Sequence, residues 1–262
     1  MKKRLQIFNP FIYIIPFFKN RIPGQLIIQY TDRCNARCPQ CGMRVTEQFR
    51  RSKLDIDVAK KIIDSAAEKG VKAISFTGGE PMIFLDEIVE LLKYAHDAGI
   101  KYTRTGTNGF IFMNPDSHDY EDRITKIAET LIKSDLYTFW ISIDSCSPDI
   151  HENMRGLPEV ISGIKKALPI FHKHGIYPSA NLGVNKNMGS SPPPSISNPL
   201  KFYEFFRDAF RKYYEFVTDM GFTMVNACYP MSVDNDNGLD AVYGATSESP
   251  VVQFSSDEKA LV

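Results

Sequence analysis

Residues 25–41 read QLIIQYTDRCNARCPQC, an apolar run followed closely by three cysteines. The run Leu26–Tyr30 is typical of a buried strand, and the spacing of Cys34, Cys38 and Cys41 is C-x3-C-x2-C. A closed structural zinc site takes four ligands, and an ordinary iron–sulfur cluster is likewise held by four cysteines. This loop supplies three thiolates. It therefore predicts a metal centre with one exchangeable coordination position, which favours chemistry at the metal over a purely structural role.

Composition narrows the class of protein. The chain has 262 residues, enough for the core of one α/β-barrel-sized domain. Lys and Arg total 31, as do Asp and Glu, and no segment is strongly basic, which argues against a non-specific nucleic-acid binder. Three of the five cysteines are crowded together, a pattern typical of metal binding in a reducing, cytoplasmic compartment. Cys146 and Cys228 are predicted to be buried apolar residues.

Residues 1–23 form an apolar and aromatic segment with a basic start. Its apolar part, Phe8–Phe18, is far shorter than the ~20 residues that span a bilayer, and two prolines interrupt it. Two interpretations remain open. The segment either packs across the underside of the domain or makes peripheral contact with a membrane surface through residues 8–18.

The rest of the chain alternates strands and helices. Apolar stripes predict helices near residues 56–67, 85–95, 124–131, 161–171 and 200–219, with Asp55 capping the first. Glycines follow the helix ends at Gly70, Gly99, Gly175 and Gly221, each directly before an apolar strand. The expected strands are Leu26–Tyr30, Lys72–Phe76, Lys101–Thr105, Tyr137–Ile143, Tyr177–Gly183 and Thr223–Cys228. This order indicates a parallel α/β sheet, either a curved partial barrel or an open doubly wound sheet.

The periodic pattern covers residues 24–230 and then fails. Residues 231–262 are predicted to be an irregular C-terminal extension, and the chain is expected to stop short of a further segment. Within the patterned part, Phe139 and Trp140 are predicted to lie in the core. The histidines are expected to be mostly surface residues or hydrogen-bonded ones.

Polar motifs follow the strands, where functional groups collect in parallel α/β folds. Gly78 and Gly79 would let the backbone approach a ligand without a Cβ in the way, and Glu80 would accept a hydrogen bond from an ammonium group. The same residues would also suit a simple tight turn. The motifs after the six expected strands are the cysteine loop, Thr77-Gly78-Gly79-Glu80-Pro81, Thr107-Asn108-Gly109, Ser142 with Asp144, Asn181, and Asn226.

The cysteine spacing after a first strand, with Gly78-Gly79-Glu80-Pro81 after a second, resembles the radical S-adenosylmethionine superfamily over roughly residues 24–229. The resemblance implies a partial (β/α)6 TIM-like barrel. It also implies a 4Fe-4S cluster held by Cys34, Cys38 and Cys41, with S-adenosylmethionine chelating the fourth iron. Many members have an aromatic residue just before the third cysteine, where this chain has Gln40, so ring contacts from that position are not expected here.

Further roles follow from the same resemblance. Gly78, Gly79 and Glu80 would receive the amino group of S-adenosylmethionine. Ser142 would lie near its ribose or carboxylate, and Arg155 would pair with the carboxylate unless it is a surface residue at a helix start. Asn181 and the backbone of residues 226–229 are candidate contacts to ribose and adenine.

The implied activity is reductive cleavage of S-adenosylmethionine to a 5′-deoxyadenosyl radical that abstracts a substrate hydrogen. The implied partners are reduced ferredoxin or flavodoxin as electron donor and an unidentified substrate. Cys228 is the only cysteine after Cys146, which gives no sign of an auxiliary cluster and favours a small-molecule or lipid-related substrate over a peptide. The alternatives are a non-catalytic iron–sulfur or zinc-binding scaffold and a zinc hydrolase, although the cysteine loop offers the latter no histidine or general base.

Overall fold

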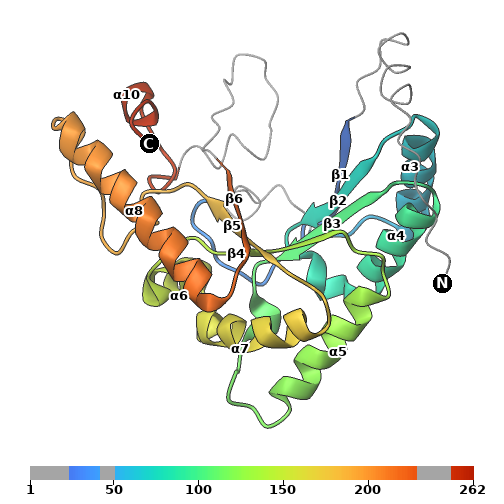
Figure 1. Cartoon of the computed structure of the whole chain (residues 1–262). Helices are drawn as coiled ribbons and strands as arrows, with labels where there is room; N and C mark the ends of the chain where they lie inside the picture. The colour runs from blue at the N-terminus through green and yellow to red at the C-terminus, as the bar shows by residue number, and fades with distance from the viewer. Residues whose placement is uncertain (1–23, 42–50, 229–248) are drawn as a thin grey trace, which may run out of the picture.

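A computed structural model of the chain describes residues 24–41, 51–228 and 249–262 (Figure 1). The predictions for residues 1–23, including the membrane contact through residues 8–18, and for residues 231–248 lie outside the described residues. None of the described helices is both long and apolar enough to cross a membrane.

A parallel sheet of six strands forms the centre of the fold, with the spatial order β1-β2-β3-β4-β5-β6. Because spatial order equals chain order, the sheet is a curved partial barrel, and the doubly wound alternative is wrong. All six predicted strands are confirmed, with ends shifted by a few residues. Their bounds are β1 Gln25–Thr31, β2 Ala73–Gly78, β3 Tyr102–Thr107, β4 Thr138–Ser142, β5 Ser179–Gly183 and β6 Met224–Cys228.

Helices connect successive strands and, in Figure 1, form an arc around one face of the sheet. As predicted, the Asp55 side chain caps α3 by accepting hydrogen bonds from the backbone N–H groups of Asp57 and Val58. Gly221 ends the longest helix at a φ of 108°, a left-handed conformation that costs glycine little. The helices are α3 Ile56–Glu68, α4 Leu85–Asp97, α5 Tyr120–Ile132, α6 Pro148–Arg155, α7 Val160–Lys173 and α8 Pro199–Met220, with the short 3-10 helices η1 Pro81–Phe84 and η2 Phe110–Phe112.

The strands present two different faces. Ile74, Phe76, Phe139 and Ile141 point outward and are at most 1% exposed, in the core formed with the helices. The alternate positions point into the barrel, because successive strand residues face opposite sides. Trp140 is one of these. The prediction that it belongs to the core with Phe139 is therefore wrong.

The end of the chain packs against the barrel. Phe254 is 8% exposed and lies 5.8 Å from Phe206 of α8 between ring centroids. The short helix α10, Ser256–Lys259, follows, and its Glu258 pairs with Lys186 at 3.0 Å. This part of the predicted irregular extension is thus anchored to the domain. Among the other cysteines, Cys146 is half-buried against the core, whereas Cys228 is exposed, so the prediction that Cys228 is buried is wrong.

Candidate cofactor site at the carboxyl ends of the strands

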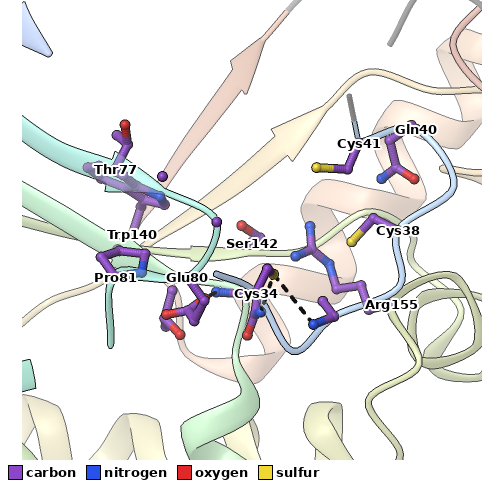
Figure 2. Close-up of a pocket in the computed structure, with 16 residues that line it drawn as sticks. Cys34, Cys38, Gln40, Cys41, Thr77, Glu80, Pro81, Trp140, Ser142 and Arg155 are labelled. Atoms are coloured by element: carbon purple, nitrogen blue, oxygen red, sulfur yellow. Dashed lines mark hydrogen bonds between the residues drawn. The ribbon is translucent and has the colours of Figure 1, made fainter. Parts of the chain in front are cut away.

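One cavity of about 280 Å³ lies where β1 to β4 end (Figure 2). Eight of the nine predicted site residues line it: Cys34, Cys38, Cys41, Gly78, Gly79, Glu80, Ser142 and Arg155. Asn181 does not line this cavity, although it pairs with Ser142 in the register of β4 and β5. Its side-chain oxygen accepts a hydrogen bond from Asn226 Nδ2 at 2.7 Å. Sequence reasoning therefore located the cavity and nearly all of its predicted wall.

The cysteine loop contains no helix or strand between Thr31 and Cys41 and is held by backbone hydrogen bonds to distant parts of the chain. Gly79 N donates to Thr31 O at 2.7 Å, and Glu80 N donates to Arg33 O at 2.8 Å. On the other side, Arg37 N donates to the carbonyl of Arg155 at 2.6 Å. The turn after β2 and the end of α6 thus position the three cysteines.

The glycines of the turn after β2 are needed for this close packing. A Cβ on Gly78 would lie 2.1 Å from Thr31 O, and one on Gly79 would lie 2.1 Å from Arg33 O. Both distances are far below contact distance. The backbone that approaches these glycines is the end of β1 and the start of the cysteine loop, while their predicted role toward a ligand stays a prediction.

Glu80 is 1% exposed, and both of its carboxyl oxygens are hydrogen-bonded. One accepts from Met82 N at 3.0 Å and the other from Asn108 N at 2.6 Å. Burial raises the pKa of Glu80 to about 7, although these hydrogen bonds oppose the rise. The side chain thus braces η1 and the loop after β3. Its predicted contact with an ammonium group would have to use the remaining lone pairs of the same oxygens.

The three cysteines stand apart around a shared space (Figure 2). Within the described part of the chain, no three His, Cys, Asp or Glu side chains come close enough together to hold a single metal ion. In an iron–sulfur cluster the thiolates do not have to converge on one atom, because each can bind a different iron. The arrangement of the three cysteines therefore fits a cluster better than it fits zinc.

The three cysteines of the loop are half-buried, and the groups near Cys34 and Cys38 are neutral hydrogen-bond donors and one cation. Cys34 Sγ accepts hydrogen bonds from Ala36 N at 3.4 Å and Asn108 Nδ2 at 3.6 Å. Burial raises the pKa of Cys34 and raises that of Cys38 to about 12, while the charge of Arg155 acts in the opposite direction on Cys38. A bound cluster would take these sulfurs as thiolates, and the N–H donors and Arg155 would stabilise that charge.

Arg155 is the last residue of α6 and is 7% exposed, so the alternative of a surface arginine at a helix start is wrong. Its Nε and Nη2 donate to the two carboxyl oxygens of Asp144 at 2.8 and 2.9 Å. Burial alone would raise the pKa of Asp144, but the Arg155 guanidinium, His151 and the hydrogen bond from Gln40 together hold that pKa below its usual range. The pair leaves Nη1 as the guanidinium nitrogen not engaged by Asp144.

Asp144 also binds residues that sequence reasoning gave no role. Gln40 Nε2 lies 3.4 Å from the Asp144 carboxylate, and the backbone N–H of Asp144 donates to His151 Nδ1 at 3.0 Å. Burial and the nearby guanidinium lower the pKa of His151 to about 3. The sequence offered two indications of this cluster. Asp144 is one of the polar residues that follow the strands, and Arg155 is one of the site residues that the family resemblance implies. Nothing in their separation indicated that they would pair.

Comparisons with known proteins agree with this geometry. The model of the Radical SAM superfamily matches residues 28–185. The chain is similar to the AdoMet-dependent heme synthase of Methanosarcina barkeri, with 27% identity over 63% of this chain and 43% of that protein. It is also similar to the GTP 3′,8-cyclase of Petrotoga mobilis, with 33% identity over 55% of this chain and 43% of that protein. The chain thus spans less than half the length of these relatives.

A solved structure has the same fold at low sequence identity. Streptococcus suis SuiB bound to S-adenosylmethionine aligns with a TM-score of 0.54 and 17% identity, covering 87% of this chain and 58% of SuiB. The family match covers most of the sheet and the nine predicted site residues from Cys34 to Asn181, whereas the predicted backbone contacts of residues 226–229 lie beyond it. The chain belongs to the Radical SAM superfamily, whose members bind a 4Fe-4S cluster and S-adenosylmethionine.

Proposed function

We propose that this protein is an enzyme that uses Cys34, Cys38 and Cys41 to hold a 4Fe-4S cluster and cleaves S-adenosylmethionine reductively. When bound, the two cofactors supply one-electron cleavage of the sulfonium, giving methionine and a 5′-deoxyadenosyl radical that removes a hydrogen atom from the substrate. The observation that carries the proposal is the cavity itself. Three cysteines and no fourth line it together with the Gly78–Pro81 turn and a buried arginine.

We assign binding of the S-adenosylmethionine carboxylate to Arg155 and Ser142. Both line the cavity, and Arg155 Nη1 is free of the Asp144 pair. A guanidinium already oriented by a buried carboxylate loses little freedom when it binds a second one. Ser142 contributes a hydroxyl that can donate to the same carboxylate or to the ribose.

We assign the amino group of the cofactor to the turn Gly78–Glu80, because this turn lines the cavity and is hydrogen-bonded to the start of the cysteine loop. Asn181 remains a proposed ribose contact on a weaker basis, since it lies next to Ser142 in register but outside the cavity wall. We extend the proposal to reduced ferredoxin or flavodoxin as electron donor and to a cytoplasmic, oxygen-poor setting.

The test is anaerobic reconstitution with iron and sulfide, followed by addition of S-adenosylmethionine and dithionite and measurement of 5′-deoxyadenosine. We expect turnover by the wild type, and loss of bound iron and at least a ~100-fold loss of turnover in Cys38→Ala, because each thiolate is a cluster ligand. Cys228→Ala is the matched control, since Cys228 is exposed and does not line the cavity. A wild type that holds a full cluster without producing 5′-deoxyadenosine would support the scaffold alternative.

The substrate is proposed to be a small molecule or a lipid-related compound. Peripheral membrane contact is proposed only through residues 8–18, and this contact remains a prediction. Binding of the purified protein to anionic or neutral liposomes, lost on deletion of residues 1–20, would support that contact. Absence of liposome binding by the intact protein would remove it.

A further inference from the structure

Arg104 is the only charged residue in the six strands of the sheet. It lies on β3 two positions before Gly106, which lines the cofactor cavity, so both residues face the inside of the barrel. The residues of β3 that alternate with these two, Thr103 and Thr105, point outward and are fully buried. The barrel interior thus carries one positive charge on a wall of otherwise neutral strand residues.

The described part of the protein does not neutralise this charge. None of the ion pairs among residues 24–41, 51–228 and 249–262 includes Arg104. Its Nη1 donates to Gln25 Oε1 at 3.3 Å, and Gln25 Nε2 in turn donates to Ser75 Oγ at 2.5 Å. Its Nε is buried and has no hydrogen-bond partner among the described residues. A buried N–H of a cation without an acceptor is costly, and an anionic ligand would supply one.

Trp140 connects Arg104 to the cofactor cavity. The guanidinium carbon lies 6.0 Å from the centre of the Trp140 ring, and Trp140 itself lines the cavity beside Ser142. Trp140 also covers Gly106, where a Cβ would lie 2.3 Å from the indole. At a rise of ~3.3 Å per residue, Arg104 is roughly 7 Å along β3 from the cavity wall.

We propose that Arg104 binds an anionic group, a carboxylate or a phosphate, on the substrate of this enzyme. This inference rests on the proposed function and deepens it by naming the class of substrate. A guanidinium binds either anion through paired hydrogen bonds, and the ring of Trp140 holds it in place. A substrate anchored there has its reacting carbon roughly 7 Å or a little more from its anionic group, at the edge of the cofactor cavity.

The experiment uses the reconstituted protein saturated with S-adenosylmethionine, without reductant, and titrates inorganic phosphate and acetate separately. Trp140 is the only tryptophan of the chain, so its fluorescence reports on this site, and calorimetry gives the dissociation constant. We expect saturable binding of at least one anion, and the tighter of the two identifies the anionic group of the substrate. Arg104→Gln should raise that dissociation constant at least 10-fold, and Arg104→Lys should raise it less, because lysine keeps the charge without the planar fork.

Arg207→Gln is the matched control, because Arg207 is an exposed arginine of α8 paired with Asp208. It should bind the anion as the wild type does. The melting temperature of Arg104→Gln checks that this variant folds. If Arg104→Gln unfolds, the Arg104→Lys titration replaces it. Equal affinity in the wild type and the tested Arg104 variant, or no binding of either anion by the wild type, would overturn the inference. Formation of 5′-deoxyadenosine is measured separately, so a failure here is distinguishable from a failure of the proposed function.

Discussion

Phe139 and Trp140 are neighbours on β4, yet they belong to different environments. Phe139 points outward, is 1% exposed and stacks on Phe171 of α7 with ring centroids 5.9 Å apart. Trp140 points inward, is half-buried and lines the cofactor cavity. The same contrast runs through the sheet, whose outer face is closed by helices while its inner face keeps polar groups beside a cavity. One face of each strand contributes mainly to stability and the other mainly to ligand binding.

The largest effect is expected from breaking the outer face. Phe139→Ala should lower the free energy of unfolding by ~3–5 kcal/mol, because it leaves a cavity among packed helices. Trp140→Ala should cost less than about half as much, because the ring is only half-buried, and should instead weaken binding of S-adenosylmethionine. Urea unfolding and cofactor titration of both variants measure this. Equal losses of stability would show that the two faces are not distinct.

The second prediction concerns the buried ion pair on the inner side. Asp144→Asn should cost about 3 kcal/mol of stability, because it leaves the Arg155 guanidinium buried without its partner. The double variant Asp144→Asn/Arg155→Gln should regain most of that stability without regaining affinity for S-adenosylmethionine. Denaturant unfolding and equilibrium binding of the three proteins separate the two effects. Recovery of both properties would mean that Arg155 has no part in binding.

The third prediction compares two glycines near the strand ends. Gly79→Ala should lower stability by about 1–3 kcal/mol and reduce iron loading, because its Cβ would overlap the carbonyl of Arg33. Gly183→Ala on β5 should change stability by less than about 0.5 kcal/mol, since nothing lies within 4 Å of that Cβ. Thermal unfolding and iron analysis after reconstitution provide the comparison. A tolerated Gly79→Ala would contradict the close packing of the cysteine loop.

The smallest effect is expected from His151. Its pKa is about 3 in the folded protein and about 6.5 when unfolded, so in that window only the unfolded chain binds the proton. The neutral, buried His151 therefore contributes to the free energy of unfolding. This contribution is complete above pH 6.5 and is lost as the pH falls. Stability should drop by about 1 kcal/mol more between pH 6 and pH 5 in the wild type than in His151→Gln. Parallel curves of stability against pH for the two proteins would show that His151 titrates normally.

Local patterns predicted much of the fold because strand and helix periods are properties of neighbouring residues. Leu26–Tyr30, the glycine after each helix and the capping Asp55 are all signals of this kind. The helix α6 was missed, since its eight residues carry mainly polar side chains. The choice between a partial barrel and a doubly wound sheet was also open, because no local signal states which strands pair.

The sequence predicted most of the residues of the candidate site but not the contacts between them. Cysteine spacing and the Gly78–Pro81 turn identified the cavity because chain order places both at strand ends. The pairing of Asp144 with Arg155, the bracing of the loops by Glu80 and the inward side of Trp140 are contacts across the chain. They depend on how the sheet curves and on which face meets the helices.

The sequence alone determined that three cysteines share a loop after the first strand, that six strands alternate with helices, and that polar motifs gather at one rim. These properties follow from spacing and periodicity, which act over a few residues at a time. Only the tertiary structure decided that Gly78 and Gly79 make room for the cysteine loop, that Arg155 is buried against Asp144, and that Arg104 lies inside the barrel without an ion pair to any described residue. Contacts between distant segments set these features, because burial and charge pairing depend on what the folded chain brings together.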